Sequence, residues 1–306
     1  MIKKIIFGTR GSTLARIQTN FVISSILKFY PKITCEIKVI KTKGDLDQNT
    51  SLKFTEHLGL FADEIQKKLI NGDIDVAIHS LKDLPINHLK NLKIGAIPVR
   101  ENPMDILYHP QGFRLNQLNS RAIIGTCSLR RTGQLRHLRN DLLIKDIRGN
   151  IETRINKVLK GEFDGIILAS AGLIRLGIDI SKYYQFNINE IIPAPGQGAL
   201  AVEIRKNDKV IENIVSKIDN LIIRKSIEIE RGILNSLGGG CSLPLGVYSC
   251  LKENQLNTNA CIVNPSTGFK KQVIINDWKG KKNKLISTIS EKLLSNGGDE
   301  IISNFK

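Results

Sequence analysis

The chain has 306 residues, with 45 lysines and arginines against 29 acids and a formal net charge of +16. A chain of this length needs more than one hydrophobic core, because single cores stop growing at about 250–300 residues. No apolar run reaches the roughly 18 residues of a membrane-spanning helix, and MIKKIIFGTR has too short an apolar centre for a signal peptide. The composition therefore predicts a soluble, cytoplasmic protein of several domains.

The first hundred residues alternate between strand-like and helix-like patterns. The strand-like segments are KKIIFG (3–8), ITCEIKVIK (33–41) and IDVAIHS (74–80). Ser12 or Thr13 is placed to cap a first helix, and LFADEIQKKLING (60–72) predicts an amphipathic helix closed by Gly72. Such alternation indicates an open α/β sheet with crossover helices.

Two segments of the first part have counterparts in the second. GTRGSTL (8–14) matches GTCSLRR (125–131), and GDIDVAIHS (72–80) matches GEFDGIILA (161–169). Short matches also arise by chance, so they leave open whether the architecture is duplicated. If it is duplicated, the chain has two similar α/β lobes.

Prolines and glycines mark two boundaries, IPVRENPMD (97–105) and IIPAPGQGALAVEIR (191–205). If the chain passes from one lobe to the other at both boundaries, a hinge and a cleft between the lobes are predicted. The strand after the second boundary is expected to rejoin the first lobe. We therefore expect domain 1 in residues 1–98 plus about 199–217, domain 2 in 104–192 and domain 3 in 218–306.

Polar residues follow several predicted strands, where open α/β sheets bind ligands, often against helix N-termini that favour anions. They are Arg10 and Ser12, Lys82 and Asp83, Thr126 and Ser128, and Arg148 and Gly149. Each residue alone is better explained as a cap or a surface residue, but their joint position at strand ends favours a binding site. The arginines of segment 125–154 favour an anion with planar oxyanion groups, either nucleic acid or a small polycarboxylate, whereas KGKKNK (279–284) is typical of solvated surface.

The cysteines show no pattern of a disulfide framework or a metal site. Cys35, Cys127, Cys241, Cys250 and Cys261 are odd in number, have no CxxC spacing and lie near no pair of histidines. Reduced thiols and no bound metal are the expectation.

Eight segments resemble, in order, the porphobilinogen deaminase (hydroxymethylbilane synthase) family, over roughly residues 5–250. They are GTRGSTLARIQT, GDIDVAIHSLKDLP, RENPMDIL, GTCSLRRTGQL, IRGNIETR, FDGIILASAGLIRLG, PAPGQGALAVEIR and ERGILNSLGGGCSLPLGVY. The resemblance implies three α/β domains, the first two resembling the lobes of a periplasmic binding protein. It also implies a monomeric transferase that joins four porphobilinogen molecules head to tail, releasing ammonia, on a dipyrromethane cofactor bound through a cysteine thioether.

The resemblance also implies roles for particular residues. Asp83 would be catalytic, stabilising the cationic azafulvene left by ammonia and moving protons, and Cys241 would carry the cofactor, while Cys127 would only fill space. The residues implied to hold the cofactor and substrate are Arg10, Ser12, Gln18, Lys82, Thr126, Ser128, Arg130, Arg131, Arg148, Gly149, Arg154 and Arg175. Arg136 and Arg139 lie outside the matched positions and are expected to be exposed helix residues.

The arginines suit this chemistry because the cofactor and four added rings bring twelve carboxylates into one site. Unit charges about 4 Å apart repel by roughly 4 kcal/mol at an effective dielectric constant near 20, so counter-charge is needed. The sequence departs from the family pattern in SLKFTEHLGLF (51–61), a loop that resembles a flap. Phe54 and Leu58 occupy positions there at which the family commonly has lysines.

Without the resemblance, the residues alone are also consistent with two other classes of function. A binding protein would share the hinge and the arginines but would not need Asp83 or Cys241. A nucleic-acid binder would spread its basic residues over an exposed face with stacking aromatics, whereas aromatics are 5% of this chain. We therefore predict that the protein acts on porphobilinogen as its substrate and binds neither nucleic acid nor a membrane.

Overall fold

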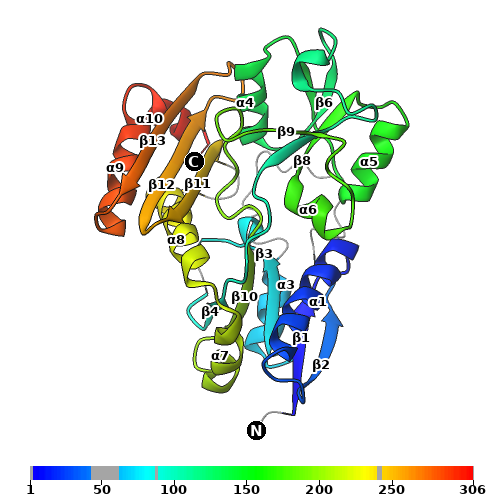
Figure 1. Cartoon of the computed structure of the whole chain (residues 1–306), viewed down its shortest axis with the longest axis vertical. Coiled ribbons are helices and arrows are strands. Elements are labelled where there is room, and N and C mark those ends of the chain that lie inside the picture. Colours follow the sequence, from blue (N-terminus) through cyan, green and yellow to red (C-terminus); the bar gives the residue numbers. More distant parts are fainter. Residues whose placement is uncertain (1–2, 43–61, 87–88, 240–242, 306) are drawn as a thin grey trace. The chain divides into compact units, whose positions relative to one another are not determined.

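The structure, a computed structural model, describes residues 3–42, 62–86, 89–239 and 243–305. Its contacts divide the chain into two compact units, shown in Figure 1. Unit 1 comprises residues 1–101 and 198–224, and unit 2 comprises residues 102–197 and 225–306. The contacts group the last 82 residues (225–306) with residues 102–197, and the division into three domains stays a prediction.

Unit 1 is a five-stranded mixed sheet between helices. Its strands, in the order β2-β1-β3-β10-β4, are β2 (Thr34–Val39), β1 (Lys4–Thr9), β3 (Val76–Ser80), β10 (Leu200–Arg205) and β4 (Leu92–Ala96). Its helices are α1 (Thr13–Leu27), the short 3-10 helix η1 (Leu81–Asp83), α3 (Asp63–Ile70), α7 (Lys209–Val215) and the 3-10 helix η3 (Ser216–Ile218). The predicted strands and helices of this unit are confirmed.

The two faces of this sheet are buried by different helices (Figure 1). Val22 and Ile26 of α1 pack with Phe7 and Ile78 on one face. Ile65 and Leu69 of α3 pack with Ile74 and Ala77 on the other. Strands covered on both sides are apolar along their whole length, which explains the continuous apolar run in β3.

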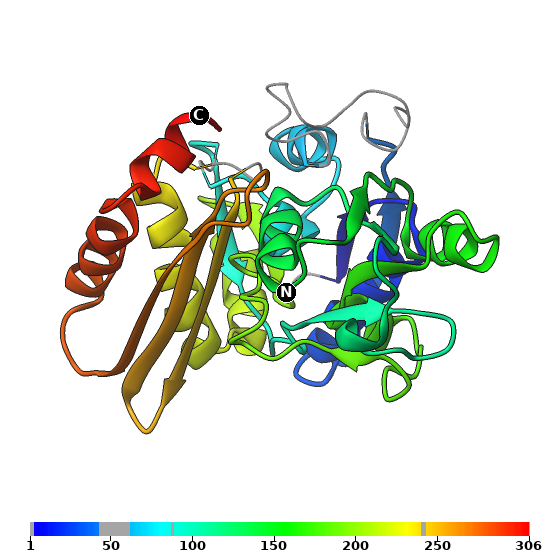
Figure 2. The same cartoon turned by 90° about the horizontal axis from the view of Figure 1, so that it is seen from above.

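Unit 2 contains a second five-stranded sheet and a three-stranded antiparallel sheet. The first has the order β7-β6-β8-β5-β9, with β7 (Leu143–Lys145), β6 (Ile123–Gly125), β8 (Gly165–Ala169), β5 (Asp105–Tyr108) and β9 (Tyr184–Gln185). Its helices are η2 (Leu115–Gln117), α4 (Leu129–Leu138), α5 (Ile151–Leu159) and α6 (Ser170–Arg175). The second sheet consists of β11 (Leu245–Lys252), β12 (Gln255–Val263) and β13 (Lys270–Trp278). Helix α8 (Leu221–Ser236) precedes this sheet in the chain, and α9 (Lys282–Leu294) and α10 (Gly298–Ser303) follow it. Helices α9 and α10 lie on one side of the sheet in Figures 1 and 2.

The two five-stranded sheets have the same topology. In unit 1, β1 is parallel to β2 and β3, and β10 pairs antiparallel with β3 and β4. In unit 2, β6 is parallel to β7 and β8, and β5 pairs antiparallel with β8 and β9. The matching segments of the sequence lie at equivalent places, so they mark a duplicated architecture. Strand β10 also joins the sheet of the first lobe, as predicted.

Helix α4 approaches strand β12 closely at one glycine. A Cβ atom added to Gly133 would lie 2.6 Å from a methyl carbon of Val263. We expect Gly133→Ala to lower the free energy of unfolding by about 1–3 kcal/mol, because overpacking outweighs alanine's better helix propensity. Denaturant unfolding checks this, and Gly133→Ala combined with Val263→Ala should recover part of the loss. Equal losses in the single and double variants would contradict this packing.

Candidate functional site

In unit 1, polar residues gather where two neighbouring parallel strands end. Strand β1 ends at Thr9, directly before Arg10, and β3 leads through Ser80 into η1, which contains Lys82 and Asp83. Because β1 and β3 are paired in parallel, their carboxyl ends lie at one edge of the sheet, where open α/β sheets bind ligands. The structure therefore brings the predicted residues of unit 1 to a common edge.

Two further predicted residues stabilise this edge. Ser12 is the N-cap of α1, and its hydroxyl accepts a hydrogen bond from the backbone N–H of Ala15. The buried amide of Gln18, one turn and a half into α1, donates to the hydroxyl of Ser80 at 3.0 Å. Gln18 thus holds the last residue of β3.

Asp83 is exposed on a turn with a fixed backbone. The N–H of Leu81 donates to the carbonyl of Ala199 at 3.0 Å, and the N–H of Leu84 donates to the carbonyl of Leu81. Leu81 and Leu84 are buried on either side of Lys82 and Asp83. A rigid turn that presents an exposed carboxylate next to a lysine suits a residue that acts on a bound cation.

In unit 2, Thr126 follows β6 and Ser128 caps the next helix, as Thr9 ends β1 and Ser12 caps α1 in unit 1. Thr126 is buried after β6, and its hydroxyl accepts from the N–H of Ser128 at 3.2 Å. Ser128 is the N-cap of α4 and accepts from the N–H of Arg131. Between them, the thiol of Cys127 donates to the carbonyl of Ile147 at 2.7 Å, which is consistent with a packing role.

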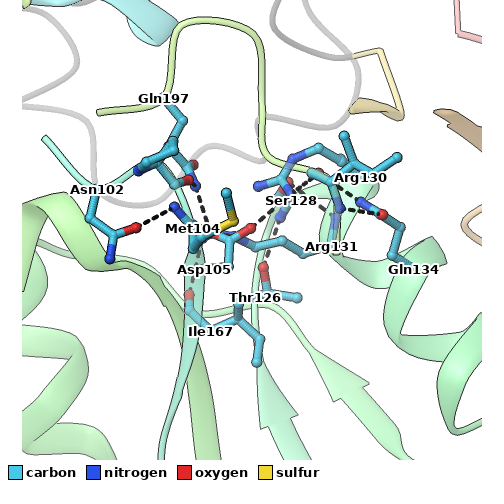
Figure 3. Close-up of polar contacts among 12 residues, drawn as sticks. Asn102, Met104, Asp105, Thr126, Ser128, Arg130, Arg131, Gln134, Ile167 and Gln197 are labelled. Atoms are coloured by element: carbon cyan, nitrogen blue, oxygen red, sulfur yellow. Dashed lines mark hydrogen bonds and ion pairs between the residues drawn. The ribbon is translucent and has the colours of Figure 1, made fainter. Parts of the chain in front are cut away.

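The first turn of α4 directs Arg130 and Arg131 at Asp105, the first residue of β5 (Figure 3). Nη1 of Arg130 donates to Oδ2 of Asp105 at 2.8 Å, and Nη2 of Arg131 donates to Oδ1 at 2.6 Å. Asp105 is fully buried, and the two arginines are 4% and 7% exposed. Gln197 also donates to Oδ1 of Asp105, at 2.9 Å, and to the carbonyl of Pro103.

This cluster has an excess of positive charge. Burial alone would raise the pKa of Asp105, but the charges of Arg130 and Arg131 and their hydrogen bonds outweigh it and hold that pKa well below its usual range. One carboxylate therefore faces two guanidinium groups. Nε of Arg130 is buried and has no hydrogen-bond partner among the residues that the structure describes.

The remaining predicted arginines lie after the end of β7, in α5 and in α6. Arg148 is half-buried, and Gly149 follows with φ of 108°, in the region that favours glycine. Nε of Arg154, in α5, donates to the carbonyl of Gly149 at 2.8 Å, so these residues are neighbours. Arg175 is the last residue of α6, one short helix away from the end of β8.

Arg136 and Arg139 correct an expectation, since neither is an exposed helix residue. Nη1 of Arg136 donates to the carbonyls of Pro265 and Ser266, because α4 packs against the turn between β12 and β13. Arg139 pairs with Asp141 at 2.7 Å and donates to the carbonyl of Leu115. Both guanidinium groups thus act in the packing of unit 2.

Four of the five cysteines lie in the described part of the chain, and all four are free thiols. Burial raises the pKa of Cys261 to about 11 and also raises that of Cys35. A thiol with a raised pKa forms little of the nucleophilic thiolate. Cys241, and Phe54 and Leu58 of the loop with the expected flap, lie outside the described residues.

The buried partners of the arginines were not predicted. Asp105 and Gln197 lie 25 and 67 residues from Arg130 along the chain. The sequence contained one signal for Asp105, a charged residue that opens the fully buried strand DILY. Gln134 was also missed: its side-chain amide accepts from the N–H of Ile192 and donates to the carbonyl of the same residue.

The described residues contain no group of three or more His, Cys, Asp or Glu side chains that could hold a metal ion. Among those same residues, no helix combines the length and apolar character needed to cross a membrane.

Two family models match the chain. Residues 5–213 match "Porphobilinogen deaminase, dipyromethane cofactor binding domain", and residues 225–295 match "Porphobilinogen deaminase, C-terminal domain". Solved structures give a weaker likeness: the periplasmic VFT2 domain of Bordetella pertussis BvgS is 13% identical with a TM-score of 0.40, over 71% of this chain and 86% of that one.

Curated relatives match over most or all of their length. A porphobilinogen deaminase of Clostridioides difficile is 45% identical over 83% of this chain and 84% of its own. Those of Natranaerobius thermophilus and Thermus thermophilus are 40% and 35% identical over 99% and 100% of both chains. The two family models and these relatives cover most of the chain, and the polar strand ends described above agree with them. The chain is therefore a member of the porphobilinogen deaminase family.

Proposed function

We infer that this chain catalyses the hydroxymethylbilane synthase reaction, condensing four porphobilinogen molecules head to tail to give the linear tetrapyrrole used in tetrapyrrole and haem biosynthesis. In each step a C–N bond breaks to release ammonia. A new C–C bond joins the freed methylene carbon to the free α-carbon of the preceding ring, which then loses its proton. One water molecule supplies the terminal hydroxyl group of the product when the finished tetrapyrrole is released by hydrolysis. This assigns the enzyme to the transferases, acting as a monomer in the cytoplasm on a small-molecule substrate.

The observation that best supports this function is the exposed carboxylate of Asp83 on its rigid turn. When ammonia leaves, positive charge develops on the substrate pyrrole. An ionised carboxylate held next to the pyrrole nitrogen stabilises that charge and accepts the proton that the α-carbon loses. The backbone that carries Asp83 is held on both sides, because Leu81 and Leu84 are buried and their N–H groups are hydrogen-bonded.

The arginines and their hydroxyl neighbours would hold the acetate and propionate groups of cofactor and substrate. The donor set fits a dipyrromethane with its carboxylates, because the Asp105 cluster has one more cation than anion and a buried guanidinium N–H with no partner among the described residues. When bound, the dipyrromethane supplies the free α-carbon to which the first substrate is joined. Arg10, Ser12, Gln18 and Lys82 in unit 1, and Thr126, Ser128, Arg130, Arg131, Arg148, Gly149, Arg154 and Arg175 in unit 2, are the proposed binding residues.

Deep burial of Arg130 and Arg131 against Asp105 disfavours nucleic acid as the anion. A phosphate backbone binds to cations that lie on an accessible face. Guanidinium groups that are less than a tenth exposed can contact only a ligand that enters the protein, which favours a small polycarboxylate.

Cys241 is the proposed attachment point of the cofactor. Among the described cysteines, Cys261 and Cys35 have raised pKa values, and Cys127 donates its S–H to a backbone carbonyl. The three glycines before Cys241 permit close approach of the backbone to a ligand. We also propose the division into domains at 1–98 plus about 199–217, 104–192 and 218–306.

Replacement of single cysteines tests this function. We expect Cys241→Ser to give folded protein at its sequence mass, without colour in an acidic aldehyde reagent for pyrroles and with little or no turnover. Cys127→Ser is the matched control and should keep both the mass increase of two condensed pyrrole units and the activity. An adduct on a peptide that contains Cys127, Cys250 or Cys261, or full activity of Cys241→Ser, would refute the assignment.

A further inference from the structure

A carboxylate that the proposed reaction does not use is buried in the sheet of unit 1. Glu203 lies in the middle of the apolar strand β10 and is fully buried. The side-chain amide of Gln66 donates to its Oε1 at 2.9 Å and to its Oε2 at 3.2 Å, and Nε2 of His79 lies 3.2 Å from Oε2. Gln66 and His79 are themselves buried.

These three residues connect three elements on one face of the sheet. In the antiparallel pairing of β3 and β10, His79 is opposite Ala201 and Glu203 is opposite Ala77, so His79 and Glu203 are diagonal neighbours. Gln66 belongs to α3, whose Ile65 and Leu69 pack with Ala77. The polar set therefore lies on the α3 face and ties the end of β3 to β10 and α3.

The next residue of β3 is held from the opposite face. Successive side chains of a strand point to opposite faces, and Ser80 accepts from Gln18 of α1 at 3.0 Å. His79 and Ser80 are thus fixed by buried polar partners on the two faces, and the N–H of Leu81 is bound to Ala199. Lys82 and Asp83 follow immediately, so these contacts set the place at which β3 presents them.

Stability alone does not explain a charged residue at this place. Taking a carboxylate out of water is costly, and replacement of buried ionic groups by apolar residues of similar volume is often neutral or stabilising. We propose that Glu203, together with Gln66 and His79, positions the turn that carries Lys82 and Asp83. This inference rests on the proposed catalytic role of Asp83 and identifies Glu203 as a positioning residue for it.

The test compares Glu203→Gln, which keeps the shape and one of the two acceptor oxygens, with Glu203→Leu, which removes both oxygens. Glu212→Gln, in a half-exposed pair with Lys93, is the control for loss of a carboxylate in the same unit. The readouts are kcat and KM per pyrrole-loaded enzyme, and hydrogen exchange of the amides of residues 80–84. Circular dichroism and thermal unfolding show whether each variant is folded.

We expect Glu203→Leu to lower kcat by about 100-fold, the effect of a displacement of about 1 Å in an active site. Its exchange at Leu81 and Leu84 should rise about tenfold, while that of α1 stays unchanged. Glu203→Gln should keep kcat within about threefold, and Glu212→Gln should match the parent chain.

Two results would overturn the inference: parent-like kcat and exchange in Glu203→Leu, or an equal loss of kcat in the Gln and Leu variants. If Glu203→Leu does not fold, Gln66→Met decides, because it removes the donor at nearly constant volume. Gln66→Met should then lower kcat and raise exchange at Leu81, and parent-like values would refute the proposal. Failure of the parent chain to use porphobilinogen would instead refute the proposed function, while the exchange measurement would still decide on positioning.

Discussion

Replacing Asp83 by alanine is expected to lower kcat by about 10²–10⁴-fold, the range of losses for removal of a group that stabilises charge and transfers protons. The fold should not change, because the Asp83 side chain is exposed and the turn is held by buried Leu81 and Leu84 and by backbone hydrogen bonds. Turnover should be measured per pyrrole-loaded molecule, so that loss of cofactor and loss of catalysis are separated. Asp83→Glu keeps the charge with a longer reach and should retain more activity than the alanine variant.

A matched control lies before the start of the same strand. Asp73 is also a carboxylate of unit 1 and precedes β3, where it pairs with Lys68 at 2.7 Å. Asp73→Ala makes the same chemical change away from the carboxyl end of the strand and should leave kcat at the parent value. Equal turnover of the Ala and Glu variants at Asp83 would show that charge at this position is not the catalytic factor.

The largest effect on stability is expected at Asp105. Asp105→Asn leaves Arg130 and Arg131 buried without their counter-ion, and breaking a buried ion pair from one side costs about 3–5 kcal/mol. Urea unfolding should show this loss near neutral pH. Asp141→Asn, which breaks the more exposed pair with Arg139, is the control and should leave the unfolding midpoint close to that of the parent chain.

The pH dependence of this difference follows from the lowered pKa of Asp105 in the folded state. The unfolded chain binds a proton at this residue at about pH 3.9, whereas the folded chain binds it only at lower pH. The stabilisation is therefore fully present above about pH 4 and is lost as the pH falls below that value. The difference in free energy of unfolding between the parent chain and Asp105→Asn should be constant from about pH 5 to 8 and shrink below about pH 4. A difference that instead grew in acid would contradict the ion pair.

The sequence predicted those parts of the site that depend on local order along the chain. Ser12 caps α1 as expected, and Arg10, Lys82 and Asp83 follow β1 and β3, which pair in parallel. Such features come from periodicity and capping within about ten residues. The duplicated sheets were indicated by GTRGSTL and GTCSLRR, although the chance of coincidence left that reading open.

The buried polar partners could not be predicted, because they depend on which distant segments meet. Glu203 and His79 are 124 residues apart, and Arg130 and Asp105 are 25 apart. An acid within an apolar run, as in ALAVEIR or before ILY, shows only that a partner is needed. The error on Arg136 has the same cause, since its partners lie in a turn about 130 residues further along the chain.

In the proposed reaction, this chain joins porphobilinogen molecules through the carboxylate at Asp83 and the cationic strand ends. The most direct test incubates the purified parent chain with porphobilinogen and measures ammonia and linear tetrapyrrole in the same samples. The reaction inferred here releases four ammonia molecules for each hydroxymethylbilane formed. Consumption of no porphobilinogen, or release of ammonia without formation of the tetrapyrrole, would contradict it.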